Sequence, residues 1–189
     1  AEIAAKPEDR WLAGMTRAVF NAGFNWKVID AKWDGFEEAF HGFDVDRCAM
    51  MDDEWLDRLV SDTRIVRNGA KILTVRDNAV FLTELREKGG AGRVFADWPA
   101  EDYVGLLDLL KTRASRLGGA SGQYFLRFAG VDSFILSADV TARLIAEGVI
   151  DKPATSKTAM RRVQEAFNTW RAQSGRSLTE ISRVLAMSV

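Results

Sequence analysis

Apolar residues recur at spacings of three and four along most of the chain, and alternating runs of β-branched residues are missing. Residues 9–22 illustrate the pattern. Their apolar stripe, which would lie along one side of a helix, consists of Leu12, Met15, Val19 and Ala22. Further helices are predicted in the first half of the chain over residues 33–40, after a cap at Asp52, from Asn68 to the stop at Gly89–Gly90, and after Pro99.

The second half of the chain continues the helical period and adds signals for helix starts. A short apolar helix is predicted over residues 123–128. The predicted caps are Ser137 for a helix over 140–146, Thr155 or Ser156 for a longer amphipathic helix, and Ser177, with Glu180 in a capping box, for the last helix. The pattern therefore predicts an all-α fold.

The 189 residues have the length of one domain, and 47% of them are hydrophobic, which is typical of a globular chain. No period of 20–50 residues repeats, and no stretch rich in Pro, Gly or Ser marks a linker. We therefore expect one helical domain spanning residues 1–189. No run of 18 apolar residues exists, so we expect no membrane span and a cytoplasmic protein.

The chain holds one cysteine, Cys48, and one histidine, His41. Two such residues exclude a disulfide framework and are too few for a zinc site. They could form a nucleophile pair only if the fold brought them together. No glycine fingerprint follows a strand, so we expect neither a nucleotide nor a redox cofactor, and we assign no metal site.

The net charge of −1 hides two halves of opposite sign. Residues 1–110 carry 14 basic and 21 acidic side chains, a net charge of −7. Residues 111–189 carry 12 basic and 6 acidic side chains, a net charge of +6. This asymmetry indicates a surface for a polyanion in the second half, although solvated helix faces also segregate charge.

A glycine-rich stretch, LGGASG at 117–122, separates two predicted helices. Its glycines, Gly118, Gly119 and Gly122, allow a tight turn and a close approach to another molecule. The backbone amides that start the next helix would face outward near Ser121, where the helix dipole favours a phosphate. The alternative interpretation is a helix–helix turn that needs small residues for packing.

Asp139 lies 17 residues after Gly122, at the start of the next predicted helix. A carboxylate in the first turn of a helix is usually a favourable partner of the helix dipole. The apolar run that precedes it, residues 134–136, indicates instead an acid that is partly removed from water. Asp139 is therefore a candidate catalytic carboxylate.

Aromatic residues crowd the predicted exit of the first long helix, in the segment FNAGFNW at 20–26. Proteins use aromatic rings to stack on a base extruded from a duplex. Phe20, Asn21 and Trp26 are therefore candidate base-binding residues. The alternative is that these rings belong to the core, as most aromatic residues in a helical protein do.

These segments resemble the DNA-3-methyladenine glycosylase I family. Residues 22–26 (AGFNW), followed by 36–40 (FEEAF) and Phe43–Asp44, are similar to the opening of that family. Residues 59–62 and 65–72 (IVRNGAKI) resemble its next signature, in which an arginine–asparagine pair leads into a lysine-bearing helix. Residues 117–143 are similar in layout to the helix-hairpin-helix of the wider DNA glycosylase superfamily, with the hairpin near 111–129 and Asp139 in the place of its aspartate.

The resemblance implies an all-α, two-lobed helix-hairpin-helix DNA glycosylase fold that holds damaged double-stranded DNA across a cleft. It implies hydrolysis of the N-glycosidic bond of a flipped-out alkylated purine such as 3-methyladenine, by a monomer and without a cofactor. Trp26, Phe20 and Asn21 would bind the base, Asp139 would be catalytic, and the hairpin would hold DNA through Gly118, Gly119, Ser121 and Gly122. Gln123 occupies the position where strand-cleaving members carry a lysine, so a monofunctional enzyme is expected.

The sequence also departs from the family pattern. Ala18 stands where the family has a glutamate that reads the base, and the paired cysteines and histidines of the family zinc site are missing. Asp139 in turn is not typical of the 3-methyladenine branch. These departures leave a second hypothesis open, a catalytically inactive glycosylase-like module that still binds DNA.

Overall fold

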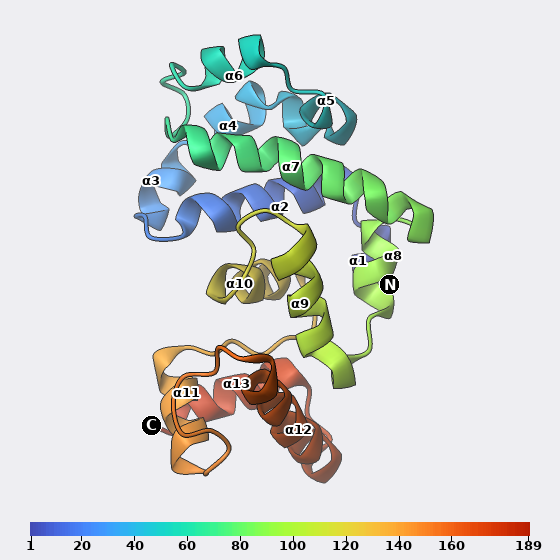
Figure 1. Cartoon of the computed structure of the whole chain (residues 1–189), viewed down its shortest axis with the longest axis vertical. Coiled ribbons are helices and arrows are strands. Elements are labelled where there is room, and N and C mark those ends of the chain that lie inside the picture. The colour runs from blue at the N-terminus through green and yellow to red at the C-terminus, as the bar shows by residue number, and fades with distance from the viewer.

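A computed structural model describes all 189 residues, and it is built from α-helices and short 3-10 helices without strands, which confirms the all-α prediction. Figure 1 shows an upper group of helices, a middle pair and a lower group. The upper group consists of α2 (Glu8–Asn21), α3 (Trp26–Ala31), α4 (Trp33–Ala39), α5 (Val45–Ala49), α6 (Asp53–Leu59) and α7 (Gly69–Leu85). The middle pair is α9 (Tyr103–Arg113) and α10 (Ala120–Ala129), and the lower group is α11 (Ala138–Ala146), α12 (Lys157–Ser174) and α13 (Leu178–Met187).

Two further helices, α1 (Glu2–Ala5) and α8 (Ala91–Asp97), pack on each other beside the upper group. The 3-10 helices are η1 (His41–Phe43), η2 (Arg86–Lys88) and η3 (Ala100–Asp102). Gly89, which ends η2, has a left-handed φ of 94°, a conformation that glycine adopts without steric cost.

Side chains cap the helices where the sequence predicts them. In each case a side-chain oxygen accepts a hydrogen bond from a backbone N–H in the first turn, which that turn would otherwise leave unpaired. The predicted caps are Asp52 on α6, Ser137 on α11 and Ser156 on α12, and Asn68 caps α7 in the same way. The choice between Thr155 and Ser156 thus falls on Ser156, and Ser177 and Glu180 complete the expected capping box of α13.

The helix predicted after Pro99 differs in detail from the structure. Pro99 precedes η3, and the regular helix α9 begins only at Tyr103. The fully buried side of α9 is formed by Tyr103, Leu106 and Leu110, whereas Val104 and Leu107 are only partly buried. The helix predicted after Pro99 is thus present, with a short 3-10 turn before its first regular turn.

The buried apolar residues form one continuous cluster that reaches from α2 to α13. At its centre the fully buried Trp11 of α2 packs against Phe95 of α8 and Phe125 of α10, with ring centroids 4.8 and 6.0 Å away. Rings of this size bury a large apolar area, and their tilted packing is favourable. The core therefore ties α10 directly to the upper helices.

The segment between α10 and α11 is irregular but firmly held. The ring of Phe134 stacks on Phe167 of α12 at 4.5 Å, and its carbonyl accepts a hydrogen bond from the Tyr103 hydroxyl. The Asp132 carboxylate accepts from the backbone N–H groups of Leu178 and Thr179 at the start of α13. These contacts fix the route of the chain from α10 into α11.

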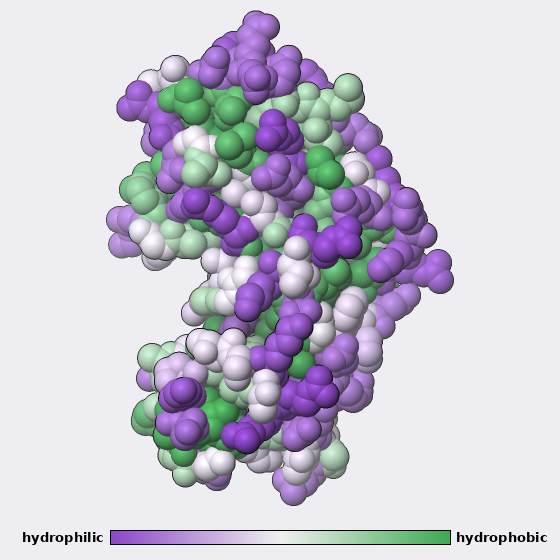
Figure 2. Space-filling model, in the orientation of Figure 1, coloured by the Kyte–Doolittle hydropathy of each residue, from purple (hydrophilic) through white to green (hydrophobic).

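In the space-filling view the left-hand outline is hollowed at the level of α10, between the upper and lower groups of helices (Figure 2). In Figure 1, α3 lies above this hollow and α11 lies below it. None of the helices combines the length and the apolar character needed to cross a membrane.

Candidate active site

The exit of α2 is fixed by a lysine from another helix. Lys71, in the first turn of α7, donates from Nζ to the carbonyl oxygens of Phe20 at 3.2 Å and Ala22 at 2.9 Å. These two carbonyls lie at the end of α2, where no further helical N–H is available to pair with them. Lys71 therefore sets the direction in which the chain leaves α2 toward Trp26.

Trp26 projects into solvent at the first position of α3, with 61% of the residue exposed. The side chain of Asn25 caps α3 by accepting from the Lys27 N–H at 3.0 Å, which fixes the backbone at the indole. The Lys27 Nζ lies 5.9 Å from the indole centroid, so the face of the ring is accessible to a cation. Phe24 is also exposed, and its ring centroid lies 5.9 Å from the Nζ of Lys71.

Asn21, the last residue of α2, carries an unpaired polar atom. Its side-chain Oδ1 is buried and has no hydrogen-bond partner. Buried acceptors of this kind are nearly always paired in native proteins, so an exception at a candidate site is informative. The two carbonyls that Lys71 holds flank Asn21 in the chain, and Phe24 N–H donates to the Asn21 carbonyl. The backbone around the Asn21 side chain is therefore fixed by three hydrogen bonds.

Phe20 does not share this exposure. Its side chain is completely buried and meets the ring of Phe36 edge-on at 4.8 Å. The prediction that Phe20 contacts a base is wrong in this conformation, because a ring without exposed surface cannot stack on a ligand. The alternative interpretation, core packing, applies to Phe20 but not to Trp26.

No carboxylate replaces the glutamate that the family carries at the position of Ala18. Ala18 is partly buried against the core. The next acid along α3 after Trp26 is Asp30, one helical turn later, and its Oδ1 lies 3.3 Å from Arg17. Asp30 is largely exposed and already has a basic partner, so it is a surface acid in an ion pair.

The glycine-rich hairpin between α9 and α10 is shaped by internal packing. A Cβ on Gly122 would collide with the carbonyl oxygen of Leu117, so only glycine fits there. Gly118 and Gly119 are exposed, and Gly119 has a left-handed φ of 60°. The start of the hairpin is held by the buried Asn78, whose side chain accepts from Ser115 N–H at 2.7 Å and donates to its carbonyl.

Some hairpin residues therefore fit the interpretation as a packed helix–helix turn, and others fit the interpretation as a contact to phosphate. Gly122 is buried and serves the packing of the turn, whereas Gly118 and Gly119 face solvent and Ser121 is half-buried. No side chain caps α10, so the amides of its first turn are not satisfied by a protein side chain.

Gln123 links the hairpin helix to the segment that leads into α11. It is buried, and its Oε1 accepts from the Leu136 N–H at 2.7 Å. An amide group at this position has no amine to offer as a nucleophile, and here it serves as a structural acceptor.

Asp139 is the second residue of α11, directly after the capping residue Ser137 and Ala138. It is exposed, so the expected partial desolvation is wrong. The apolar run before it is buried through Phe134, but the chain reaches solvent before Asp139.

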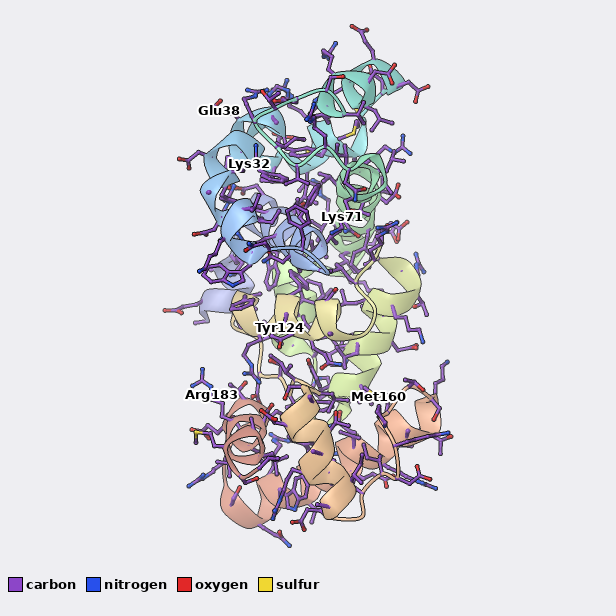
Figure 3. All side chains as sticks on the ribbon, turned by 90° about the vertical axis from the view of Figure 1, so that its left-hand side faces the viewer. Lys32, Glu38, Lys71, Tyr124, Met160 and Arg183 are labelled. Atoms are coloured by element: carbon purple, nitrogen blue, oxygen red, sulfur yellow. The ribbon has the colours of Figure 1, made fainter.

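Burial and a neighbouring positive charge act on two basic side chains, Lys71 and Arg127. Partial burial, with a further contribution from Arg116, lowers the pKa of Lys71. Partial burial also lowers the pKa of Arg127 on α10, with a contribution from Arg183 on α13. Figure 3 shows Lys71 above and Arg183 below the level of Tyr124 on α10. The Lys71 ammonium is held by backbone carbonyls, and the Arg127 guanidinium is held by the hydroxyl and carbonyl of Ser133, rather than by carboxylates.

The lone histidine and cysteine do not form a pair. The His41 ring lies 5.1 Å from Trp55, whereas the buried Cys48 thiol donates to the Phe40 carbonyl at 3.6 Å. No three histidine, cysteine or acidic side chains lie close enough together to hold a metal ion.

Comparison with known proteins gives consistent matches. Residues 7–100 match the model of the methyladenine glycosylase family. DNA-3-methyladenine glycosylase 1 of Escherichia coli (strain K12) is 32% identical over 68 residues, so the chain matches about a third of that relative's length, 36% of each protein.

Solved structures of 3-methyladenine DNA glycosylase I superpose on the chain. One such structure gives a TM-score of 0.55 at 22% identity over 65% of this chain and 78% of the other. A tyrosine-to-phenylalanine variant in complex with 3-methyladenine gives 0.59 at 20% identity over 66% and 78%. The Staphylococcus aureus protein gives 0.56 at 21% identity over 65% and 76%.

These superpositions define the class of protein: an all-α protein with the 3-methyladenine glycosylase I fold. The family match covers α2 to α8 and includes Trp26, Lys71 and the exit of α2. Residues 7–100, about half of the chain, belong to the methyladenine glycosylase family.

Proposed function

We propose that this protein is a DNA glycosylase that hydrolyses the N-glycosidic bond of an alkylated purine, such as 3-methyladenine, in duplex DNA. The fold and the family both support an enzyme of base-excision repair. We propose further that it acts in the cytoplasm as a monomer, which is the simplest arrangement for a protein that must bind a bent duplex.

The observation that carries this proposal is the exposed indole of Trp26, in the same short segment as the unpaired Oδ1 of Asn21. Stacking on an aromatic ring compensates for part of the cost of extruding a base. A purine alkylated at N3 is cationic before cleavage, and an indole face attracts cations. Asn21 stays a proposed base-binding residue, but its Oδ1 is buried and would have to turn outward to accept a hydrogen bond from the exocyclic amine of adenine.

Asp139 is the proposed catalytic carboxylate. Loss of the base leaves positive charge on the sugar, and a carboxylate stabilises that charge or activates the attacking water. Its exposure keeps it accessible to water and to DNA. Because the buried Gln123 offers no amine, we propose water as the nucleophile and a monofunctional enzyme.

The hairpin and the basic groups beside it are the proposed DNA-holding elements. Gly118, Gly119 and Ser121 present backbone amides at the start of α10, where the helix dipole favours a phosphate. Gly122 contributes by allowing the turn rather than by contact, because it is buried. Binding of this kind weakens steeply as salt rises.

The experiment that tests this function is the release of free base from methylated duplex DNA, followed by chromatography. We expect release of 3-methyladenine by the unmodified protein and a loss of about 100-fold or more in turnover for Asp139→Asn. Asp151→Asn, a change at another exposed acid, is the matched control and should leave turnover unchanged.

Duplex binding is measured on the same samples to separate catalysis from affinity. We expect Asp139→Asn to bind duplex DNA as the unmodified protein does. Full activity in this variant would reduce Asp139 to a partner of the helix dipole, and no base release by the unmodified protein would count against the enzyme.

The second candidate function is a catalytically inactive module that binds DNA. Ala18 favours it, because no free carboxylate stands in for the family glutamate near the exit of α2. This hypothesis predicts salt-sensitive duplex binding without base release. Absence of duplex binding at low salt would contradict both functions.

A further inference from the structure

Two aromatic side chains on the outer face of α10 have no role in the core. Tyr124 and Phe128 lie one turn apart with nearly parallel rings, their centroids 6.2 Å apart and the planes at 22°. They are 42% and 81% exposed, whereas Gln123, Phe125 and Leu126 on the other face of the helix are buried. An exposed pair of stacked aromatic rings indicates an interaction site.

The position of this pair indicates the kind of partner. Figure 3 looks onto the hollowed side of the molecule and shows Tyr124 at its middle, with Lys71 above and Arg183 below. Tyr124 thus lies on this side of the molecule between two basic side chains, Lys71 and Arg183. Aromatic rings between positive charges fit a ligand with flat apolar bases and a polyanionic backbone.

We propose that Tyr124 and Phe128 form a stacking surface for bases of duplex DNA that lose a neighbour when the damaged nucleotide is extruded. Extrusion leaves an unpaired base and a gap in the stack, and both expose π-faces to the protein. Rings that protrude from a helix anchored in the core can contact such faces without rearrangement. This inference rests on the proposed function and adds to it a surface separate from the segment around Trp26.

The test compares two duplexes, one intact and one with a stable tetrahydrofuran analogue of an abasic site. The unmodified protein should bind the duplex with the abasic analogue more tightly than the intact one. Tyr124→Ala and Phe128→Ala should each reduce that preference by about tenfold, the usual effect of removing a ring that stacks on a base. Binding to the intact duplex should change by less than about twofold, because the basic groups remain.

Met50→Ala is the matched control, since Met50 is 83% exposed and ends α5 in the upper group of helices. Tyr124→Phe keeps the ring and should keep the preference. A 2-aminopurine placed next to the abasic analogue reports base stacking directly through its fluorescence. The change in this fluorescence on protein binding should be lost in Phe128→Ala.

The possible outcomes separate the inference from the proposed function. If the unmodified protein releases base but binds both duplexes equally, or if both alanine variants keep the preference, the stacking surface is overturned and the enzyme stands. If the protein neither releases base nor binds duplex, both fail. Sedimentation that shows a dimer dissociated by Phe128→Ala would assign the pair to self-association and would also overturn the inference.

Discussion

Lys71 Nζ donates a hydrogen bond to the carbonyl oxygen of Ala22 at 2.9 Å and so joins the first turn of α7 to the end of α2. The two residues are 49 positions apart in the chain. A second bond from the same ammonium group, to the Phe20 carbonyl oxygen at 3.2 Å, means that Lys71 holds the carbonyls on both sides of Asn21 rather than a single one. The segment with Asn21 and Trp26 therefore depends on α7 for its conformation.

We predict that Lys71→Met loosens this segment and lowers the free energy of unfolding by about 1–3 kcal/mol, since hydrogen bonds to charged groups contribute that much. Urea denaturation measures the stability, and hydrogen exchange of the amides of residues 22–26 measures the local effect. Lys88→Met, at an exposed lysine in η2 without a hydrogen bond, is the control. Unchanged hydrogen exchange in Lys71→Met would show that residues 22–26 keep their conformation without the Lys71 hydrogen bonds.

A second prediction compares two glycines of the hairpin. Gly122→Ala places a methyl group against the Leu117 carbonyl and should cost about 2 kcal/mol or more, because backbone must move to make room. At Gly118 the nearest atom is the flexible Cγ of Lys111 at 3.3 Å, so Gly118→Ala should cost much less. Thermal unfolding of both variants checks this order. Equal losses would contradict the packing role assigned to Gly122.

A third prediction separates Phe20 from Trp26. Phe20→Ala empties a fully buried site and should destabilise the protein by about 3–5 kcal/mol. Trp26→Ala removes a largely exposed ring and should change stability by no more than about 0.5 kcal/mol. On methylated DNA, Trp26→Ala should impair base release, whereas Met50→Ala, at another exposed apolar residue, should not. A large loss of stability in Trp26→Ala would assign its indole to the core.

The parts of the fold that the sequence predicts well are local ones. The caps Asp52, Ser137 and Ser177 are predicted correctly because a cap is decided by side chains within three residues of the helix start. Phe20 and Trp26 lie in one aromatic segment, yet one is buried and the other exposed. That difference depends on Phe36 of α4 and on the direction that Lys71 gives to the chain, which no local pattern contains.

For Asp139 and for the aromatic pair on α10, too, the local sequence does not determine which side chains are exposed. The apolar run before Asp139 predicts burial correctly for Phe134, but the turn into α11 brings the carboxylate to the surface. Tyr124 and Phe128 carry a signal that the sequence offers, two rings four residues apart on the side opposite Phe125. What the sequence does not contain is the hollow at the level of α10, which forms only when the upper and lower helices pack around that helix.

The last prediction concerns the dependence of stability on pH. Burial raises the pKa of the Cys48 thiol from an ordinary value of 9.0 to about 12. Above pH 9 the unfolded chain therefore releases a proton that the folded chain keeps, and the free energy of unfolding falls as pH rises toward 12. The slope from this one thiol approaches about 1.4 kcal/mol per pH unit.

Urea denaturation of the unmodified protein and of Cys48→Ser between pH 8 and pH 10, on the order of one unit either side of the unfolded thiol pKa, isolates this contribution. Serine can still donate to the Phe40 carbonyl but does not titrate in this range. Burial also raises the pKa of Tyr103, which adds alkaline loss of stability in both proteins and cancels in the comparison. The unmodified protein should lose stability more steeply than Cys48→Ser, and parallel slopes would mean that the thiol reaches water in the folded state.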